Sequence, residues 1–329
     1  MEGQRKFMST LWNSYAFFVL YANIDNFNAT EHTLEYDKLS VMDKWILSRL
    51  NTMVKAVDEN LDQYRIPEAA RALQEFVDDM SNWYVRRSRE RFWAKGMEQD
   101  KINAYMTLYT ALVTVSKAAA PMIPFMTEEI YQNLVRSVDQ NAPESIHLCM
   151  FPEVNEDQID TELEQNMEHV LKLVVMGRAC RNTSNIKNRQ PIGQMFVKAA
   201  FDLPEFYQDI VADELNVKNV KFTDDVRDFT SYSFKPQLKT VGPKYGKMLG
   251  GIKAALDHAD GNSAMDEINE TGALKLDVSG QEITLFKEDL LIDTAQIEGY
   301  VSENDNGITV VLDTNLTPEL LEELSLIHI

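Results

Sequence analysis

The sequence predicts a mainly α-helical protein, in which a helical bundle is followed by a smaller domain of mixed α and β structure. Between residues 40 and 182, apolar residues recur at helical spacing in long stretches that short connections separate. After Gln190 the apolar stretches become short, and some alternate with polar residues as strands do. The 329 residues are enough for two domains, each with its own core.

The bundle is expected to begin with a helix over residues 40–62. Ser40 is suited to cap this helix, with Asp43 near its positive end, and six apolar residues form one stripe. A second helix is expected from Pro67 to about Lys95, where Gly96 can end it. The further helices are predicted at about 101–119, from Thr127 onward, and at about 159–181.

The second domain is expected to begin near residues 190–195. Strands are predicted at 196–201 and 217–223, with a short helix between them, and a further helix is predicted within 243–259. A turn is expected at Gly280, before EITL (282–285), and a hairpin is expected at Asn306-Gly307.

Charge and cysteine usage restrict the possible functions. The formal net charge is −20, and residues 262–329 alone hold 15 acidic residues against two lysines, so this part should repel a phosphate backbone. Two cysteines cannot form a disulfide framework or a four-cysteine zinc site, and no metal site is expected; they fit a reducing cytoplasm. The basic and then apolar N-terminal stretch is interpreted as an amphipathic helix, because polar residues interrupt it. No apolar run approaches the ~20 residues that span a bilayer.

One segment of this acidic chain concentrates positive charge and aromatic surface. It carries Trp83, Arg86, Arg87, Arg89, Arg91, Trp93 and Lys95. On an uninterrupted helix, Arg87, Arg91 and Lys95 share one face, and replacing Arg87 and Arg91 with Ala should then leave the bundle folded. Such a stripe suits a phosphate backbone, and Trp offers a stacking plane for an unpaired base. The alternative is an ordinary solvated helix face with core aromatics.

A second basic cluster follows the fifth helix, at the expected domain boundary. It contains Arg178, Arg181, Asn182, Lys187 and Arg189 and no acidic residue. These side chains suit RNA phosphates and sugars, although a helix C-terminus with favourable cations followed by a polar linker explains them equally well. The acidic pairs in 213–216 and 288–290 are interpreted as solvated positions, and no catalytic constellation is found.

These segments resemble one family. The anticodon-binding domain of isoleucyl-tRNA synthetases has a signature similar to SNWYVRRSRERFW (81–93), and class I synthetases for isoleucine, valine and leucine share a helix similar to APMIPFMTEEIYQNL (120–134). Isoleucyl enzymes also have stretches similar to RNTSNIKNRQPI (181–192), DELNVKNVKF (213–222) and KPQLKTVGPKYGK (235–247), the last two in a eukaryote-like branch that lacks a C-terminal zinc site. The resemblance extends to about Glu323.

The resemblance implies the C-terminal portion of a longer enzyme. Residues 1–39 would be a remnant helix after a missing catalytic domain, 40–192 the anticodon-binding bundle, and 193–329 an acidic α/β domain truncated at its end, since LSLIHI matches nothing expected. The parent enzyme would attach isoleucine to its tRNA using ATP and magnesium in the missing domain, which carries the HIGH and KMSKS motifs; the editing domain is also missing. This portion alone should be inactive.

The resemblance also implies a partner and a site. Isoleucine tRNA is the expected partner of a monomeric cytoplasmic protein, and Trp83, Trp93 and the arginines between them would lie at or near the anticodon-binding surface. Two alternatives are the corresponding region of a valyl or leucyl synthetase and a non-catalytic helical interaction module. Competition between tRNAs tests for the sister synthetase, and the salt dependence of binding tests for the interaction module.

Overall fold

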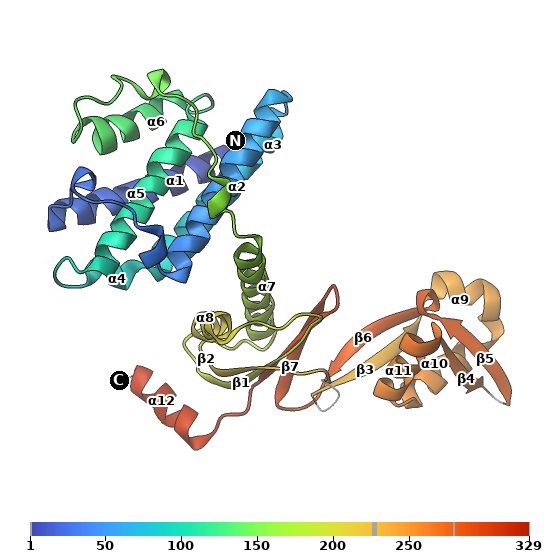
Figure 1. Ribbon diagram of the computed structural model, residues 1–329. Helices are drawn as coiled ribbons and strands as arrows, with labels where there is room; N and C mark the ends of the chain where they lie inside the picture. The colour runs from blue at the N-terminus through green and yellow to red at the C-terminus, as the bar shows by residue number, and fades with distance from the viewer. Residues whose placement is uncertain (1, 226–228, 279, 329) are drawn as a thin grey trace. The chain divides into compact units, whose positions relative to one another are not determined.

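The structure, a computed structural model, describes residues 2–225, 229–278 and 280–328 (Figure 1). The chain divides into two compact units, residues 1–165 and 166–329. This division falls within helix α7, whereas the sequence places the boundary near residues 190–195. Within the described ranges, no helix has the length and apolarity needed to cross a membrane.

The first unit is helical. Its elements are α1 (Glu2–Asp25), α2 (Val41–Asp62), α3 (Ile66–Asp79), α4 (Arg89–Trp93), α5 (Gln99–Ala119) and α6 (Pro124–Tyr131), π-helical segments Met80–Val85 and Gln132–Arg136, and short 3-10 helices Ala29–Glu31, Tyr36–Lys38, Ile146–Leu148 and Glu156–Gln158. Helix α7 (Thr161–Thr183) begins in this unit and continues into the second.

Helix α2 confirms the predicted start of the bundle. Ser40 caps it by accepting a hydrogen bond from the Asp43 backbone, and the Asp43 carboxylate accepts one from the Ser40 backbone, which is a complete capping box. The predicted apolar stripe is buried from Ile46 to Val57. Helix α1 packs within the same unit, where Phe17 and Phe18 meet Phe92 and Tyr105 edge to face.

The single helix expected from Pro67 to Lys95 is wrong. The chain instead passes from α3 into a π-helical segment, turns at Ser88 and leaves helical geometry at Ala94. Tyr84 and Phe92 are both buried. The π-helical segment and the turn at Ser88 change the face on which the later side chains lie, and both rings reach the core. Gly96 has a φ of +79°, as a helix stop requires.

The second unit contains a four-stranded sheet with the order β2-β1-β8-β7. Its elements are β1 (Ile192–Lys198), α8 (Glu205–Leu215), β2 (Val217–Phe222), β7 (Tyr300–Asp305) and β8 (Ile308–Asp313), with α12 (Pro318–His328) after them. Strands β1 and β2 are parallel and α8 connects them, while β8 pairs with β1 and β7 in antiparallel register. The predicted hairpin at Asn306-Gly307 is confirmed, with positive φ at both residues.

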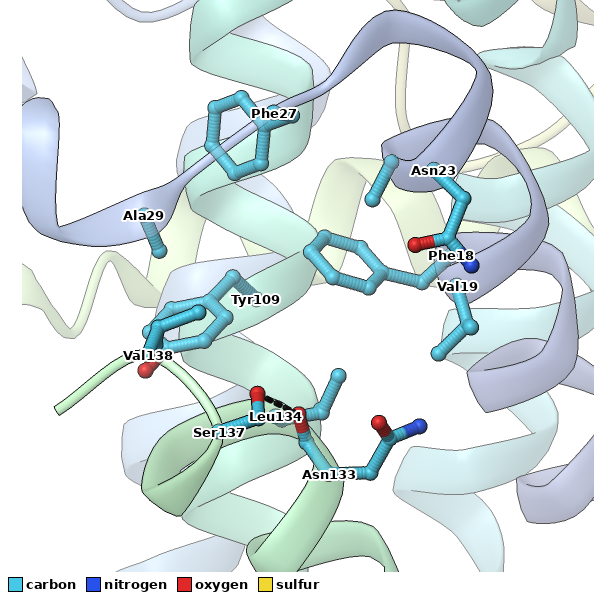
Figure 2. Close-up of a pocket in the computed structure, with 11 residues that line it drawn as sticks. Phe18, Val19, Asn23, Phe27, Ala29, Tyr109, Asn133, Leu134, Ser137 and Val138 are labelled. Carbon is cyan, nitrogen blue, oxygen red and sulfur yellow. Dashed lines mark hydrogen bonds between the residues drawn. The ribbon is translucent and has the colours of Figure 1, made fainter. Parts of the chain in front are cut away.

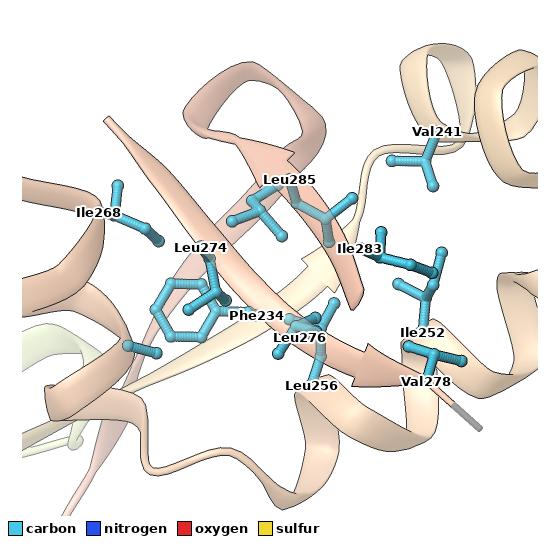
Figure 3. Close-up of a cluster of buried hydrophobic side chains, with 12 residues drawn as sticks. Phe234, Val241, Ile252, Leu256, Ile268, Leu274, Leu276, Val278, Ile283 and Leu285 are labelled. Atoms are coloured by element: carbon cyan, nitrogen blue, oxygen red, sulfur yellow. The ribbon is translucent and has the colours of Figure 1, made fainter. Parts of the chain in front are cut away.

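A separate module is inserted between β2 and β7. Its elements are β3 (Thr230–Pro236), α9 (Leu238–Tyr245), a 3-10 turn (Gly246–Met248), α10 (Leu249–His258), α11 (Gly261–Thr271), β4 (Ala273–Val278), β5 (Gln281–Phe286), a 3-10 turn (Lys287–Asp289) and β6 (Leu290–Gln296). Strand β3 pairs with β6, and β4 with β5. Figure 3 shows its core, in which side chains from β3, β4, β5 and the helices point toward one another. The turn at Gly280 between β4 and β5 was predicted, but the β3–β6 pair and α11 were not.

Candidate nucleic-acid interface

Arg86 and Trp83 form the best-defined part of the predicted binding segment. The Arg86 guanidinium carbon lies 5.6 Å from the centre of the Trp83 ring, and Arg86 Nε donates a hydrogen bond of 2.8 Å to the Asn82 carbonyl. Both contacts join residues three or four apart, so the local helical geometry itself creates them. Arg86 is exposed and Trp83 half-buried, which leaves a cation and an aromatic ring together at the surface.

Arg91 lies in a different environment. Its Nη1 and Nη2 donate to the two carboxylate oxygens of Asp43 at 2.8 and 2.9 Å, and its Nε donates to Asp100 Oδ2 at 2.9 Å. The Arg91 side chain is 17% exposed and the Asp43 side chain is fully buried. The expected exposed stripe of Arg87, Arg91 and Lys95 is therefore wrong, because the chain turns at Ser88 and Arg91 faces the core.

Asp43 shows how strongly this ion pair is coupled to the core. Burial by itself raises the pKa of Asp43, but hydrogen bonds from Arg91, Tyr84 and Ser40 and the positive charge of Arg91 outweigh that effect, so the pKa is lowered. The Tyr84 hydroxyl donates to Asp43 Oδ1 at 2.6 Å, and its pKa is raised by burial and by Asp43. A carboxylate in the first turn of α2 thus holds α4 through Arg91.

The remaining predicted residues of this segment lie nearer the solvent. Arg89 and Lys95 are exposed, and Arg87 is half-buried. The Trp93 side chain is 56% exposed, and its Nε1 donates to the Tyr21 hydroxyl of α1 at 2.7 Å. Its indole plane is therefore held at the surface by a polar contact.

In the second unit, Arg181 is fully buried, although the sequence suggested an RNA-binding role. Its guanidinium donates to the carbonyls of Lys187 (2.9 Å), Gln190 (3.0 Å) and Asn216 (3.2 Å), and also to that of Leu215. Burial lowers the pKa of Arg181 to about 10. Arg181 joins the loop after α7 to the turn between α8 and β2.

The loop that Arg181 holds presents polar side chains outward. Asn182, Lys187 and Arg189 are exposed, and Asn216 supports the loop by donating to the Arg189 carbonyl at 3.0 Å. Arg178 is paired with Glu214 at 2.9 Å, and the Glu214 side chain is only 3% exposed. Glu214 was therefore wrongly interpreted as solvated. The same holds for Asp289, which is fully buried and paired with Lys244.

The two basic clusters belong to different units, and each is a separate candidate surface. The counterions Asp43 and Glu214 and the loop-holding role of Arg181 were not predicted. The Ser40–Asp43 spacing indicated only a helix cap, and no local pattern connects Asp43 with a residue 48 positions later.

A small pocket of about 110 Å³ lies elsewhere in the first unit. Figure 2 shows Phe18 and Tyr109 across this pocket, with Asn133, Leu134 and Ser137 below them. Its lining contains no arginine or lysine. The pocket therefore contributes no positive charge to either cluster. Among the described residues, no group of three His, Cys, Asp or Glu side chains could hold a metal ion.

The chain is similar in sequence to several known proteins. Residues 43–197 match the family model described as the anticodon-binding domain of tRNA ligase. Over 322 residues the chain is 48% identical to an isoleucine–tRNA ligase of Clostridium acetobutylicum, covering 98% of this chain and 31% of that protein. Over 327 residues it is 40% identical to isoleucine–tRNA ligase 2 of Bacillus cereus and 38% identical to the isoleucine–tRNA ligase of Porphyromonas gingivalis, covering 31% and 28% of them.

Residues 43–197 therefore belong to the family of anticodon-binding domains of tRNA ligases. Along nearly its whole length the chain is related to the isoleucine–tRNA ligases, which confirms the resemblance seen in the sequence. The chain spans 31% of the length of the Clostridium acetobutylicum relative.

Proposed function

We propose that this chain binds the anticodon stem and loop of tRNA, and that the tRNA it binds is the one for isoleucine. The observation that carries the proposal is the exposed Arg86 guanidinium against Trp83, beside exposed Arg89, inside the segment that matches the anticodon-binding domain. Guanidinium groups neutralise phosphates, and an aromatic plane beside them can accept an unstacked base.

Arg91, Arg178 and Arg181 contribute to this function indirectly. Ion pairs occupy Arg91 and Arg178, and backbone carbonyls occupy Arg181. These arginines set the positions of the segments that carry Arg86, Arg89, Lys187 and Arg189. The proposed RNA contacts are accordingly the exposed side chains, with Trp83 and Trp93 as stacking planes.

The test is fluorescence anisotropy of labelled isoleucine tRNA, titrated with this chain at two salt concentrations and with valine and leucine tRNAs as competitors. Salt-sensitive binding that prefers isoleucine tRNA is expected. Equal competition by valine or leucine tRNA would assign the chain to a sister synthetase. Binding that does not depend on salt would favour an apolar helical interaction module.

A matched pair of variants localises the contact. Replacing Arg86 and Arg89 together with Ala should weaken binding about tenfold and make the slope of log K against log salt shallower by about 2. The control replaces Arg65 and Arg71 with Ala and so removes the same charge, because both are exposed arginines at the N-cap of α3 or within it, outside the basic segment. Equal affinities of the double variant and the control would exclude this segment as the phosphate contact.

The parent reaction is part of the same proposal. In the longer relatives, this region would hold the tRNA while ATP, magnesium and isoleucine react in a domain outside this chain, so the chain by itself should not aminoacylate tRNA. A monomer in the cytoplasm is proposed on the same grounds. Size-exclusion chromatography with light scattering tests the oligomeric state.

A further inference from the structure

The module between β2 and β7 has an uneven charge distribution. From Phe229 to Leu256 the sequence contains five lysines and no acidic residue, whereas residues 257–296 contain ten acidic residues and two lysines. All five lysines are exposed. This segment lies outside residues 43–197, which match the anticodon-binding domain. In a chain with a net charge of −20, so long a run without an acidic residue is a local excess of positive charge.

Two of the five lysines have structural partners. Lys235 pairs with Asp293 at 2.9 Å, and Lys244 Nζ lies 2.9 Å from both carboxylate oxygens of the buried Asp289. Lys244 also lies 5.8 Å from the centre of the Phe286 ring. These contacts fix the end of α9 to the turn between β5 and β6. Lys239, Lys247 and Lys253 make no ion pair with any residue in the described ranges, so their charges remain available.

The backbone beside these lysines is open. A Cβ added at Gly242, Gly246 or Gly250 would meet no heavy atom within 4 Å. At Gly251, by contrast, it would lie 2.5 Å from Val278 Cγ1 of β4. Helix α10 therefore packs inward through Gly251 and the buried Ile252, and presents Gly250 and Lys253 outward. Glycines without side-chain cover let a ligand approach the backbone closely.

We propose that Lys239, Lys247 and Lys253, with the open backbone at Gly242, Gly246 and Gly250, form a second RNA-binding surface that contacts the phosphate backbone of tRNA. Mobile lysines and bare backbone suit a repeating phosphate chain, which needs neutralisation without base-specific geometry. The acidic residues elsewhere in the module repel phosphate and so favour contact at these lysines. The identity of the RNA as tRNA rests on the function proposed above, whereas the surface is defined by its own residues.

The test compares three variants of the full chain in the anisotropy assay. The first replaces Lys239, Lys247 and Lys253 with Ala; the control replaces the exposed Lys198, Lys275 and Lys287 with Ala and so removes the same charge elsewhere in the second unit. The third is the Arg86 and Arg89 double variant. Circular dichroism and thermal unfolding confirm that each variant is folded, as expected for exposed positions.

The proposal expects the first variant to bind tRNA about tenfold more weakly than the control, with a salt slope shallower by ~2 to 3. If this variant matches the control while the double variant is weakened, the second surface is wrong and the proposed function stands. If the lysine variant is weakened while the double variant is not, the second surface is supported and the Arg86 and Arg89 segment is excluded as an RNA contact. No tRNA binding at low salt by the unaltered chain overturns both.

A membrane surface is the other polyanion that such lysines could meet. Sedimentation with vesicles of phosphatidylserine and phosphatidylcholine distinguishes the two. Vesicle binding that the triple variant loses, combined with unchanged tRNA binding, would overturn the assignment to RNA.

Discussion

Arg91 in the first unit is half-buried and Arg181 in the second is fully buried, and these two arginines of the basic segments are neutralised differently. Arg91 has a bidentate carboxylate partner in Asp43, so a negative charge neutralises its positive charge. Arg181 has only backbone carbonyls as hydrogen-bond acceptors in the described part of the chain, and its Nε has no partner there. One arginine therefore stabilises an ion pair between two helices, whereas the other organises a loop through several weaker dipoles.

The largest expected effect is at Arg91. Arg91→Ala should lower the free energy of unfolding by about 3–5 kcal/mol, because it leaves the buried Asp43 carboxylate without its counterion. Urea unfolding monitored by circular dichroism measures this loss. Combining Arg91→Ala with Asp43→Asn should recover part of it; strictly additive effects would contradict the coupling. This corrects the expectation that Arg91 can be replaced without cost to the fold.

The next effect is at Arg181. Arg181→Met should lower the free energy of unfolding by about 1–3 kcal/mol, because carbonyls lose their donor but no carboxylate is left behind. The loop before β1 should also become more accessible, which limited proteolysis within residues 184–190 can detect. A loss as large as that of Arg91→Ala would remove the distinction between the two arginines.

A smaller effect is the pH dependence of stability, which should differ between Asp79 and Asp43 of the first unit. Burial raises the pKa of Asp79 to about 6, although Arg49 at 3.1 Å opposes the rise. A raised folded-state pKa gives stability that is full below the unfolded value of about 3.9 and is lost as pH rises through 6. Asp79→Asn should therefore become more stable relative to the unaltered chain by about 1–2 kcal/mol between pH 5 and pH 8.

Asp43 has the opposite dependence. Its pKa is lowered, so its contribution is present above about pH 3.9 and lost as pH falls further. Asp43→Asn should accordingly be less stable than the unaltered chain at neutral pH, and this difference in stability should disappear only in acid. Unfolding curves of both variants at pH 3.5, 5 and 8 measure these two pH dependences. Parallel pH profiles would refute the opposite pKa shifts of Asp79 and Asp43.

The smallest expected effect is at Trp93. Trp93→Phe removes the 2.7 Å hydrogen bond to Tyr21 and should cost about 0.5–1.5 kcal/mol. Tyr21→Phe removes the same bond but keeps the indole, so it is the matched control. If Trp93 is a stacking plane for RNA, Trp93→Ala, which removes the ring, should also weaken tRNA binding, whereas Tyr21→Phe should not.

The sequence predicted those features that local patterns determine. Helix α2, its capping box and the Asn306-Gly307 hairpin each depend on a few adjacent residues, and all three are confirmed. The pairing of β3 with β6 depends on residues about 60 positions apart, and no local signal specifies it. Strand β1 also begins four residues earlier than predicted.

Composition predicted which segment carries the candidate site, but the sequence did not predict which of its side chains are exposed. The arginines of segment 86–91 look equivalent in sequence, yet Arg86 meets a tryptophan at the surface and Arg91 meets a buried carboxylate. Helical spacing alone placed Arg87, Arg91 and Lys95 on one face, because the pattern gave no indication of the π-helical segment or of the turn at Ser88.

The strand order of the second unit has a consequence for synthesis on the ribosome. Strand β1 ends at Lys198 and its antiparallel neighbour β8 begins at Ile308. At ordinary elongation speeds this interval takes roughly 5–20 s, during which β1 can pair only with β2. Throughout that interval one side of β1 offers unpaired backbone groups to other nascent chains. Strand β8 therefore protects the newly made unit from edge-to-edge association as well as completing its sheet.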